Sequence, residues 1–588
     1  MNMRWSLKEL YPSFDSDLFK NDMKKCFELI TKINDWVKFN LDTVEGSVYK
    51  IETFLKMQIE FGNIYSRLYE FAFLTLSVDA KNEQALQIIE LLENKSTDLA
   101  EPLVKFKKWL SKFENLDTLI SCSDLLKEHT FYLNEFIAET KYLLNEKEEV
   151  LIAKMKNTGS KAWEKLQELL SSTLLVDINI DGEEKKLPLS IVRNMAYEKD
   201  ASIRKKAYEA ELKAYDKIAE SSAAALNGIK GEVITESKIR GYSSPLEMTL
   251  IHSRMDQETL DAMFTAIKES LPSFRKYLRK KAEILGHKNG LPFFDLFAPL
   301  GEIEMKFTYE EAQNFIVKNF SKFSPSLGNF AKNAFEKQWI DAEPREGKRG
   351  GAFCSNIHSI KESRILSNFT GMFNDVTTLA HELGHGYHGE CLKNETYLNS
   401  DYPMPIAETA SIFAETIIIN AALKEASQEE AFAILESDLM SSTQVIVDIY
   451  SRFLFEDEVF KRRENHSLSV DELNQLMLDS QIKAYGDGLD KNYLHPYMWI
   501  CKPHYYSADY NYYNFPYAFG LLFSKGLYAI YLEKGKDFVP EFNNLLASTG
   551  KNNLVDVAKK MNIDLHSLDF WRNSLKLIEK DIEKFINM

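Results

Sequence analysis

Glycine and proline are both scarce in this chain of 588 residues, at 24 and 15. Because these residues interrupt helices most strongly, their scarcity favours long helices and a mainly α fold. No run approaches ~18 consecutive apolar residues, so a membrane-spanning helix is not expected. The first residues, Met1 to Phe14, include Arg4, Lys8 and Glu9 and lack an apolar core, so no signal peptide is expected.

An excess of positive charge is also missing. The chain has 72 basic and 88 acidic side chains, a formal net charge of −16, which disfavours a nucleic-acid partner whose phosphates need a basic face. The five cysteines are scattered, odd in number and without a C-x-x-C pair. They indicate reduced thiols and a cytoplasmic protein rather than a disulfide framework.

The amino-terminal part reads as helix after helix. Apolar residues recur at spacings of three and four from Ser16 to Leu174, and capping residues at Asn115–Asp117 and Ser121–Ser123 mark candidate helix boundaries. The same periodicity returns from Ile191 to Ile239 and from Asp256 to Leu285. A chain of this length is sufficient for two or three packed lobes.

A β-hairpin is predicted within residues 174–189. Apolar side chains alternate at Val176 and Ile178, and the dipeptide Asp181-Gly182 then supplies a tight turn in which glycine tolerates positive φ. We therefore expect an amino-terminal helical lobe over residues 1–190 that ends in this hairpin.

Two segments rich in glycine and proline are predicted to be irregular, Gly286–Gly301 and Glu343–Ser355. The second ends in the short apolar stretch Ala352-Phe353-Cys354. Glycines that admit a close backbone, followed by a strand, suit an edge strand along which an extended peptide could lie. The alternative for this segment is an ordinary loop.

A metal-binding motif is the strongest chemical signal. Three of the eleven histidines, His381, His385 and His388, fall within eight residues, and the first two enclose Glu382 in the pattern HExxH. Residues four apart lie on one face of a helix, so His381 and His385 can bind one ion. Nitrogen donors suit zinc best, although ligand type alone also admits Mn, Co or Ni. Glu382 would lie beside the open coordination position and act as general base toward a water.

The helix that carries this motif has its own signals. Either Asn374 or Asp375 can cap its start. Its apolar face is formed by four residues: Val376, Leu379, Ala380 and Leu383.

The third ligand has two candidates at this stage. His388 lies seven residues after His381 on nearly the same helical face, and Glu408 opens a second predicted helix. Glu415 follows seven residues after Glu408, where it could accept a hydrogen bond from a ligand imidazole; a solvated helix glutamate is the alternative.

Near the carboxyl end, residues 495–520 hold seven tyrosines and two histidines. Phenol and imidazole groups can stabilise the oxyanion that forms when water attacks an amide. Any single tyrosine here could equally pack in a core, but the density as a whole favours a functional role.

With these residues in hand, the chain resembles oligoendopeptidase F of the thimet-oligopeptidase superfamily of metallopeptidases. The resemblance is carried by Trp5-Ser6-Leu7, Glu139–Asp181, His381–His388, Ala407–Ser411, Lys502–Tyr506 and Tyr513–Gly520. It implies a mainly α fold with two helical lobes around a deep substrate channel and a small β-sheet near the active site. It also implies one Zn²⁺ and short unfolded peptides as substrates.

The resemblance further assigns roles to particular residues. Glu408 matches the third zinc ligand of the family, which leaves His388 beside the ligands, and Glu415 matches a supporting glutamate. The substrate-contacting histidine and tyrosines of the family match His504, Tyr510, Tyr513 and Tyr517. Phe515 stands where many relatives have another tyrosine, so the hydroxyl that serves the oxyanion stays unassigned.

The sequence thus predicts a zinc endopeptidase for oligopeptides, with its catalytic domain over residues 191–588. Two alternatives remain open at this point. One is a zinc hydrolase of another amide or a strict exopeptidase, and the other is a non-catalytic peptide-binding protein with structural zinc. The sequence indicates nothing about oligomeric state.

Overall fold

The structure, a computed structural model, describes residues 2–301 and 305–588. Most of these residues lie in helices, with two small sheets, which confirms the predicted mainly α fold. The amino-terminal helices are α1 (Asp17–Asn40), α2 (Ser47–Val78), α3 (Glu83–Ser96), α4 (Ala100–Leu110), α5 (Leu116–Ser121), α6 (Asp124–Glu128), α7 (Thr130–Thr140), α8 (Glu146–Thr158) and α9 (Ser160–Thr173).

The helix boundaries in this region follow the capping residues. Asn115 accepts a hydrogen bond from the backbone N–H of Thr118 at the start of α5, and Ser123 accepts one from Leu126 at the start of α6. The boundaries predicted at these two places are confirmed. Two compact hydrophobic clusters hold α1–α7 together, and they are separate from the large cluster of the remaining chain.

The predicted hairpin is confirmed as β1 (Leu175–Ile180) and β2 (Glu183–Pro188), which pair antiparallel. Both turn residues have positive φ, 55° at Asp181 and 85° at Gly182, as a type I′ turn requires. The side chains of Val176 and Ile178 are buried in the large cluster, where the hairpin packs against α11 (Ala201–Tyr215).

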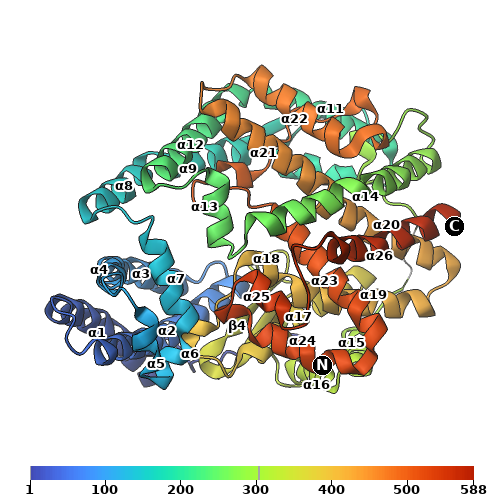
Figure 1. The fold of residues 1–588 in the computed structure, drawn as a ribbon. Helices are drawn as coiled ribbons and strands as arrows, with labels where there is room; N and C mark the ends of the chain where they lie inside the picture. Colours follow the sequence, from blue (N-terminus) through green and yellow to red (C-terminus); the bar gives the residue numbers. More distant parts are fainter. Residues whose placement is uncertain (1, 302–304) are drawn as a thin grey trace.

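The remaining elements alternate long helices with short connections. The helices are α10 (Leu189–Asn194), α12 (Ala219–Arg240), α13 (Pro245–His252), α14 (Gln257–Ile284), α15 (Tyr309–Phe323), α16 (Pro325–Glu336), α17 (Phe373–Leu392), α18 (Met404–Ala407), α19 (Thr409–Glu425), α20 (Gln428–Thr443), α21 (Ile449–Arg463), α22 (Val470–Tyr485), α23 (Phe515–Lys534), α24 (Phe538–Ala547), α25 (Leu554–Lys559) and α26 (Leu568–Asn587). A π-helical turn, η6 (Gln444–Asp448), joins α20 to α21. Figure 1 shows two helical halves, one with α9, α12, α13, α21 and α22 and the other with α1–α7, α16, α17 and α24.

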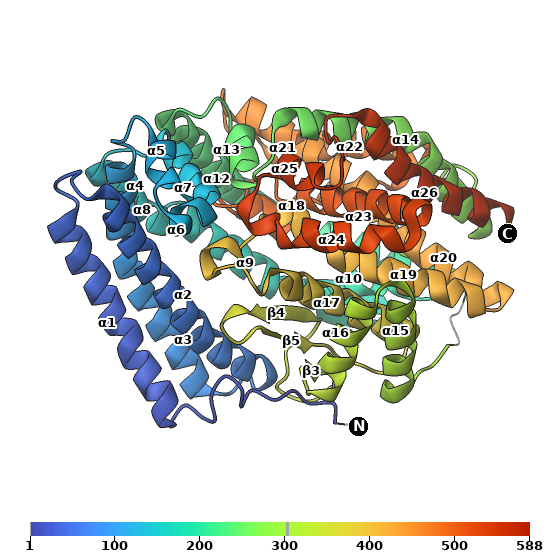
Figure 2. The same ribbon diagram turned by 60° about the horizontal axis from the view of Figure 1, so that its bottom comes forward.

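A three-stranded sheet accompanies α17. Its order is β3 (Ile340–Asp341), β5 (Glu362–Leu366), β4 (Phe353–Ile357), with β3 parallel and β4 antiparallel to β5. Figure 2 shows this sheet beside α17 and next to the amino-terminal helices. Because β4 pairs on one side only, it is an edge strand, as the glycine-rich segment before it predicts.

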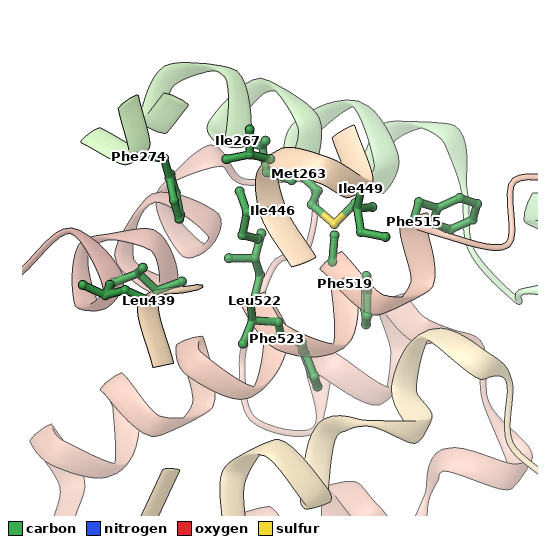
Figure 3. Packing of buried hydrophobic residues seen from close by; sticks show 14 of the residues in the cluster. Met263, Ile267, Phe274, Leu439, Ile446, Ile449, Phe515, Phe519, Leu522 and Phe523 are labelled. Atoms are coloured by element: carbon green, nitrogen blue, oxygen red, sulfur yellow. The ribbon is translucent and has the colours of Figure 1, made fainter. Parts of the chain in front are cut away.

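One face of α23 is fixed in the main hydrophobic core. Figure 3 shows this packing between α14, α20, η6, α21 and α23. The labelled side chains are Met263, Ile267, Phe274, Leu439, Ile446, Ile449, Phe515, Phe519, Leu522 and Phe523, all fully or nearly fully buried. This packing orients α23, whose opposite face is then available to the candidate site.

Candidate metal centre and its surroundings

The helix α17 carries the HExxH segment and begins at Phe373, with Met372 in the capping position, so the prediction of Asn374 or Asp375 as the cap is wrong. The carboxylate of Asp375 accepts hydrogen bonds from the backbone N–H groups of Thr370 and Met372, at 2.7 and 3.0 Å. Asp375 thus lies in the first turn of the helix and binds the backbone that precedes it. Met372 occupies the N-cap position. The four apolar residues predicted for its buried face are all fully buried: Val376, Leu379, Ala380 and Leu383.

Glycine within the motif allows α19 to approach α17 closely. A Cβ atom added to Gly384 would lie 2.5 Å from the carbonyl oxygen of Ala410 and 2.5 Å from Cα of Ser411. Gly520 plays the same part on α23, where an added Cβ would lie 2.8 Å from Cβ of Glu408. The two glycines bring three helices together around Glu408.

The side chains of His381, His385 and Glu408 converge. Oε2 of Glu408 lies 3.1 Å from Nε2 of His381 and 3.4 Å from Nε2 of His385. Zinc bonds of ~2.0–2.1 Å in a tetrahedron place ligand atoms about 3.3 Å apart. The spacing and the chemistry of the three donors therefore fit one divalent ion, and all three ligand atoms lie within 4.8 Å of one another.

Two further groups hold these ligands in place. Oε2 of Glu415 lies 3.2 Å from Nδ1 of His381, so the imidazole donates its N–H there and directs Nε2 to the cluster. The hydroxyl of Ser411 donates to Oε2 of Glu408 at 2.9 Å. The contact of Glu415 is predicted by the sequence, whereas that of Ser411 is not.

The electrostatics of the cluster follow from these contacts. Burial lowers the pKa of His381, but the hydrogen bonds to Glu408 and Glu415 outweigh it and raise that pKa to about 10. Burial raises the pKa of Glu408, and the two histidines more than offset it and hold that pKa well below its usual range. The imidazole of His381 and the carboxylate of Glu408 therefore interact strongly. The negative charge that this interaction keeps on Glu408 suits a site for a cation.

Glu382 sits beside the cluster in a dry environment. Only 7% of the residue is exposed, and burial raises the pKa of its carboxyl against the opposing effect of the two histidines. Within residues 2–301 and 305–588 no hydrogen bond to its carboxylate is found. An unengaged carboxylate with a raised pKa is well suited to accept a proton near neutral pH.

His388 does not join the cluster. It is fully buried, its Nε2 lies 2.8 Å from the hydroxyl of Thr549, and its ring stacks on Tyr402 at a centroid distance of 4.0 Å. Burial lowers the pKa of His388 to about 3. Seven residues bring a side chain back to nearly the same face but displace it by about 10.5 Å along the helix axis, so the ring lies farther along α17.

The histidine and tyrosines of the carboxyl-terminal block lie together. The ring of Tyr513 stacks on His504 at 5.2 Å and contacts Tyr517 at 5.9 Å and Tyr510 at 5.5 Å. Burial raises the pKa of Tyr517 to about 12, with smaller contributions from Tyr513 and Glu408. Tyr517 is thus the member of this group whose pKa the carboxylate of Glu408 helps to raise, and its phenol stays protonated at neutral pH.

The other members of this group differ in exposure and bonding. Tyr510 is 63% exposed, whereas Nδ1 of His504 is buried with no hydrogen-bond partner in the described part of the chain. Burial lowers the pKa of His504, with further lowering from Arg452 and Lys502, so the imidazole is neutral at neutral pH. A neutral imidazole and several phenols can donate hydrogen bonds to a developing oxyanion.

The edge strand β4 is attached to the motif helix. The side-chain amide of Asn356 donates to the carbonyl oxygen of His385 at 3.0 Å. A Cβ on Gly389 would lie 2.4 Å from that amide, so this third glycine of α17 admits the strand. Strand β4 therefore packs against the helix that carries His381 and His385.

The pair α18–α19 also has an unusual composition. Met404–Glu425 is long and apolar enough to span a membrane, yet 56% of its most apolar window is buried inside the protein. It carries Glu408 and Glu415 into the cluster, which is the behaviour of a core helix.

Family models and known proteins match most of this chain. The sequence model of peptidase family M3 matches residues 194–577, and that of Oligopeptidase F matches residues 112–174. Oligopeptidase PepF of Bacillus subtilis is 24% identical over 99% of this chain and 86% of its own length. An oligoendopeptidase F homologue of Borreliella burgdorferi is 23% identical over 97% of this chain and 98% of its own.

Solved structures share the fold. A crystal structure of a Chlamydophila abortus protein aligns with a TM-score of 0.84 at 22% identity, covering 99% of this chain and 98% of that one. Oligoendopeptidase F of Enterococcus faecium aligns with a TM-score of 0.71 at 16% identity, covering 96% and 98%. At these identities the structural similarity concerns the fold.

Proposed function

The chain belongs to peptidase family M3, and from that premise we propose that it is a zinc-dependent endopeptidase that hydrolyses short, unfolded oligopeptides. The observation that carries the proposal is the convergence of His381, His385 and Glu408 within 4.8 Å. Two nitrogen donors and one carboxylate are the ligand set of a hydrolytic zinc site that keeps one position open. When bound, the ion supplies Lewis acidity and lowers the pKa of a water.

Glu382 is the proposed general base. It takes a proton from the attacking water and passes it to the leaving amine, which needs a carboxyl pKa near the working pH. Its burial and its raised pKa support this role.

The oxyanion is proposed to be stabilised by His504, Tyr513 and Tyr517. Tyr510, at the exposed rim of this group, is proposed to contact the substrate. Tyr517 is the preferred donor because its phenol is near Glu408 and its pKa is raised to about 12. A donor held in a dry site toward the developing charge stabilises the transition state more than the ground state.

The unpaired edge of β4 is the proposed binding site for the backbone of the peptide substrate. An extended peptide can add to an unpaired strand through main-chain hydrogen bonds, which depend little on side-chain identity. The attachment of Asn356 to the carbonyl of His385 keeps this edge in register with the metal ligands. This mode of binding suits unfolded peptides rather than folded proteins.

Cytoplasmic location is proposed on the same grounds as in the sequence. All five cysteines are free thiols in the structure. Reduced thiols are the usual state in a cytosol.

The experiment that tests the function is peptide cleavage with and without a chelator. Internally quenched unfolded peptides should be cut, and the cleavage should vanish on chelation and return with zinc. Glu382→Gln should keep zinc bound and lose turnover, which separates chemistry from binding. Cleavage only of free-end dipeptides would indicate an exopeptidase, and zinc binding without any cleavage would indicate a peptide-binding protein.

A further inference from the structure

A cavity of about 290 Å³ opens beside the metal cluster. His381 and Glu408 line it at one end, and the space continues past Glu415 between α19, α20 and α23. A ligand in this cavity would therefore lie next to any peptide bond that is cut at the cluster. None of the roles assigned above uses the far end of the cavity.

The far end is reached along one face of α23. Tyr517, Leu521 and Lys525 all line the cavity and are spaced by four residues, so they form one stripe on that helix. Phe519 and Phe523 lie on the opposite side, in the core of Figure 3. The core packing thus fixes the direction in which Lys525 is presented, two turns beyond Tyr517.

Lys525 has an unusual environment for a lysine. The residue is 7% exposed, and the closest carboxylate oxygen, Oδ2 of Asp438, lies 3.9 Å from its Nζ. That distance exceeds hydrogen-bond length, and no hydrogen bond from this ammonium is found in residues 2–301 and 305–588. A buried ammonium is costly unless its donors are satisfied, so this one is available to an acceptor that enters the cavity.

The acidic side chains near Lys525 do not occupy the hydrogen-bond donors of its ammonium. Glu415 is engaged with His381 at the other end of the cavity. Burial raises the pKa of the Asp581 carboxyl, whereas its electrostatic interaction with Lys525 lowers that pKa. Asp438 is the acid closest to the ammonium, and at 3.9 Å it offsets the positive charge without accepting a hydrogen bond.

We propose that Lys525 binds a carboxylate of the peptide substrate at the far end of this cavity, and so selects peptides that carry an acidic group on one side of the scissile bond. The acid is either an Asp or Glu side chain or the terminal carboxylate. The apolar walls at Ile412, Ile419 and Leu521 exclude water and strengthen a charge-assisted hydrogen bond there. The assignment rests on the peptidase function proposed above.

A set of matched peptides tests the proposal. Internally quenched peptides differ only by Glu, Gln, Lys or Ala at each of the three positions on either side of the cut, and a second set compares free with amidated carboxyl ends. The enzymes are wild type, Lys525→Met, Lys525→Arg and the control Lys560→Met, which removes a charge from an exposed lysine at the end of α25.

Wild type should cut the Glu peptide at one position, or the free-end peptide, about ten-fold faster in kcat/KM than its Gln or amidated counterpart. Lys525→Met should bring this ratio close to one by slowing cleavage of the Glu or free-end peptide, and Lys525→Arg and Lys560→Met should keep it. A preference among the peptides that vary by position would identify a side-chain carboxylate. A preference for free over amidated carboxyl ends would identify the terminal carboxylate. An unchanged ratio in Lys525→Met, or a wild-type preference for Lys at that position, overturns the assignment.

A binding measurement separates this proposal from the peptidase function. Fluorescence anisotropy of labelled Glu and Gln peptides with Glu382→Gln, alone and combined with Lys525→Met, reports the same selectivity without turnover. Failure of wild type to cut any peptide would refute the peptidase function, whereas equal binding of the two peptides to Glu382→Gln would refute only the role of Lys525. Melting temperatures of all variants identify any loss of folding.

Discussion

Replacing Glu415 with Ala should weaken zinc binding without removing a ligand. Its carboxylate accepts the Nδ1–H of His381 at 3.2 Å and so orients the other ring nitrogen toward the ion. Loss of such an outer contact costs roughly 10- to 100-fold in metal affinity. Because 34% of the Glu415 side chain is exposed, water can replace part of the bond. We therefore expect the lower end, about ten-fold or about 1.4 kcal/mol.

Two other variants define the scale of the effect. Glu408→Ala deletes a ligand and should lose far more affinity than Glu415→Ala. His388→Ala should change zinc affinity little, because its ring contacts Thr549 and Tyr402 rather than the cluster. The expected order of zinc loss is therefore Glu408→Ala, then Glu415→Ala, then His388→Ala.

Competition with a chromophoric chelator at fixed pH measures these affinities, with the free thiols blocked beforehand. Glu425→Ala is the matched control, since this glutamate ends the same helix α19 and pairs with Lys318 at the surface. Equal zinc affinity in Glu415→Ala and wild type would refute the orienting role of the carboxylate. A larger loss in His388→Ala than in Glu408→Ala would refute the ligand assignment itself.

Three further outcomes are expected. Tyr517→Phe should lower kcat roughly 100-fold with a smaller change in KM, while Tyr528→Phe on the same helix should not; an unchanged kcat would move the oxyanion role to a neighbouring group. Gly384→Ala should destabilise the protein by about 2–3 kcal/mol in urea unfolding, since its Cβ meets two backbone atoms at 2.5 Å, whereas Gly350→Ala, with open space around it, should be neutral. Burial lowers the pKa of His388 to about 3, below its unfolded value of about 6.5, so the metal-free protein should lose stability as pH falls through this range. His388→Gln should flatten that loss between pH 6 and 4, and an unchanged slope would contradict it.

Local signals predicted the elements well. The alternation of Val176 and Ile178 around a turn with glycine specified the hairpin, because positive φ at Gly182 carries no steric cost. The periodicity before residue 174 specified helices, and Asn115 and Ser123 specified where two of them begin. Each of these signals depends on residues within a few positions of one another.

The site was predictable only where its residues are close in sequence or belong to a recurring pattern. The spacing of His381 and His385 fixes their common face whatever the rest of the chain does. The choice between His388 and Glu408 could not be made from spacing, because it depends on how α19 crosses α17. The contacts of Ser411 and Asn356 depend on the same crossing and left no separate signal in the sequence.

Two glycines in the sequence explain how these helices cross, although their role is recognised only from the structure. Gly384 lies between His381 and His385, and Gly520 lies three residues after Tyr517; each leaves room for a residue of the neighbouring helix to approach closely. A glycine inside a helix normally costs about 1 kcal/mol relative to alanine. At these two positions the close approach brings Glu408 to the imidazoles and Tyr517 to Glu408. The same orientation of α23 presents Lys525 to the cavity, so the metal site and the proposed carboxylate site depend on one helix packing.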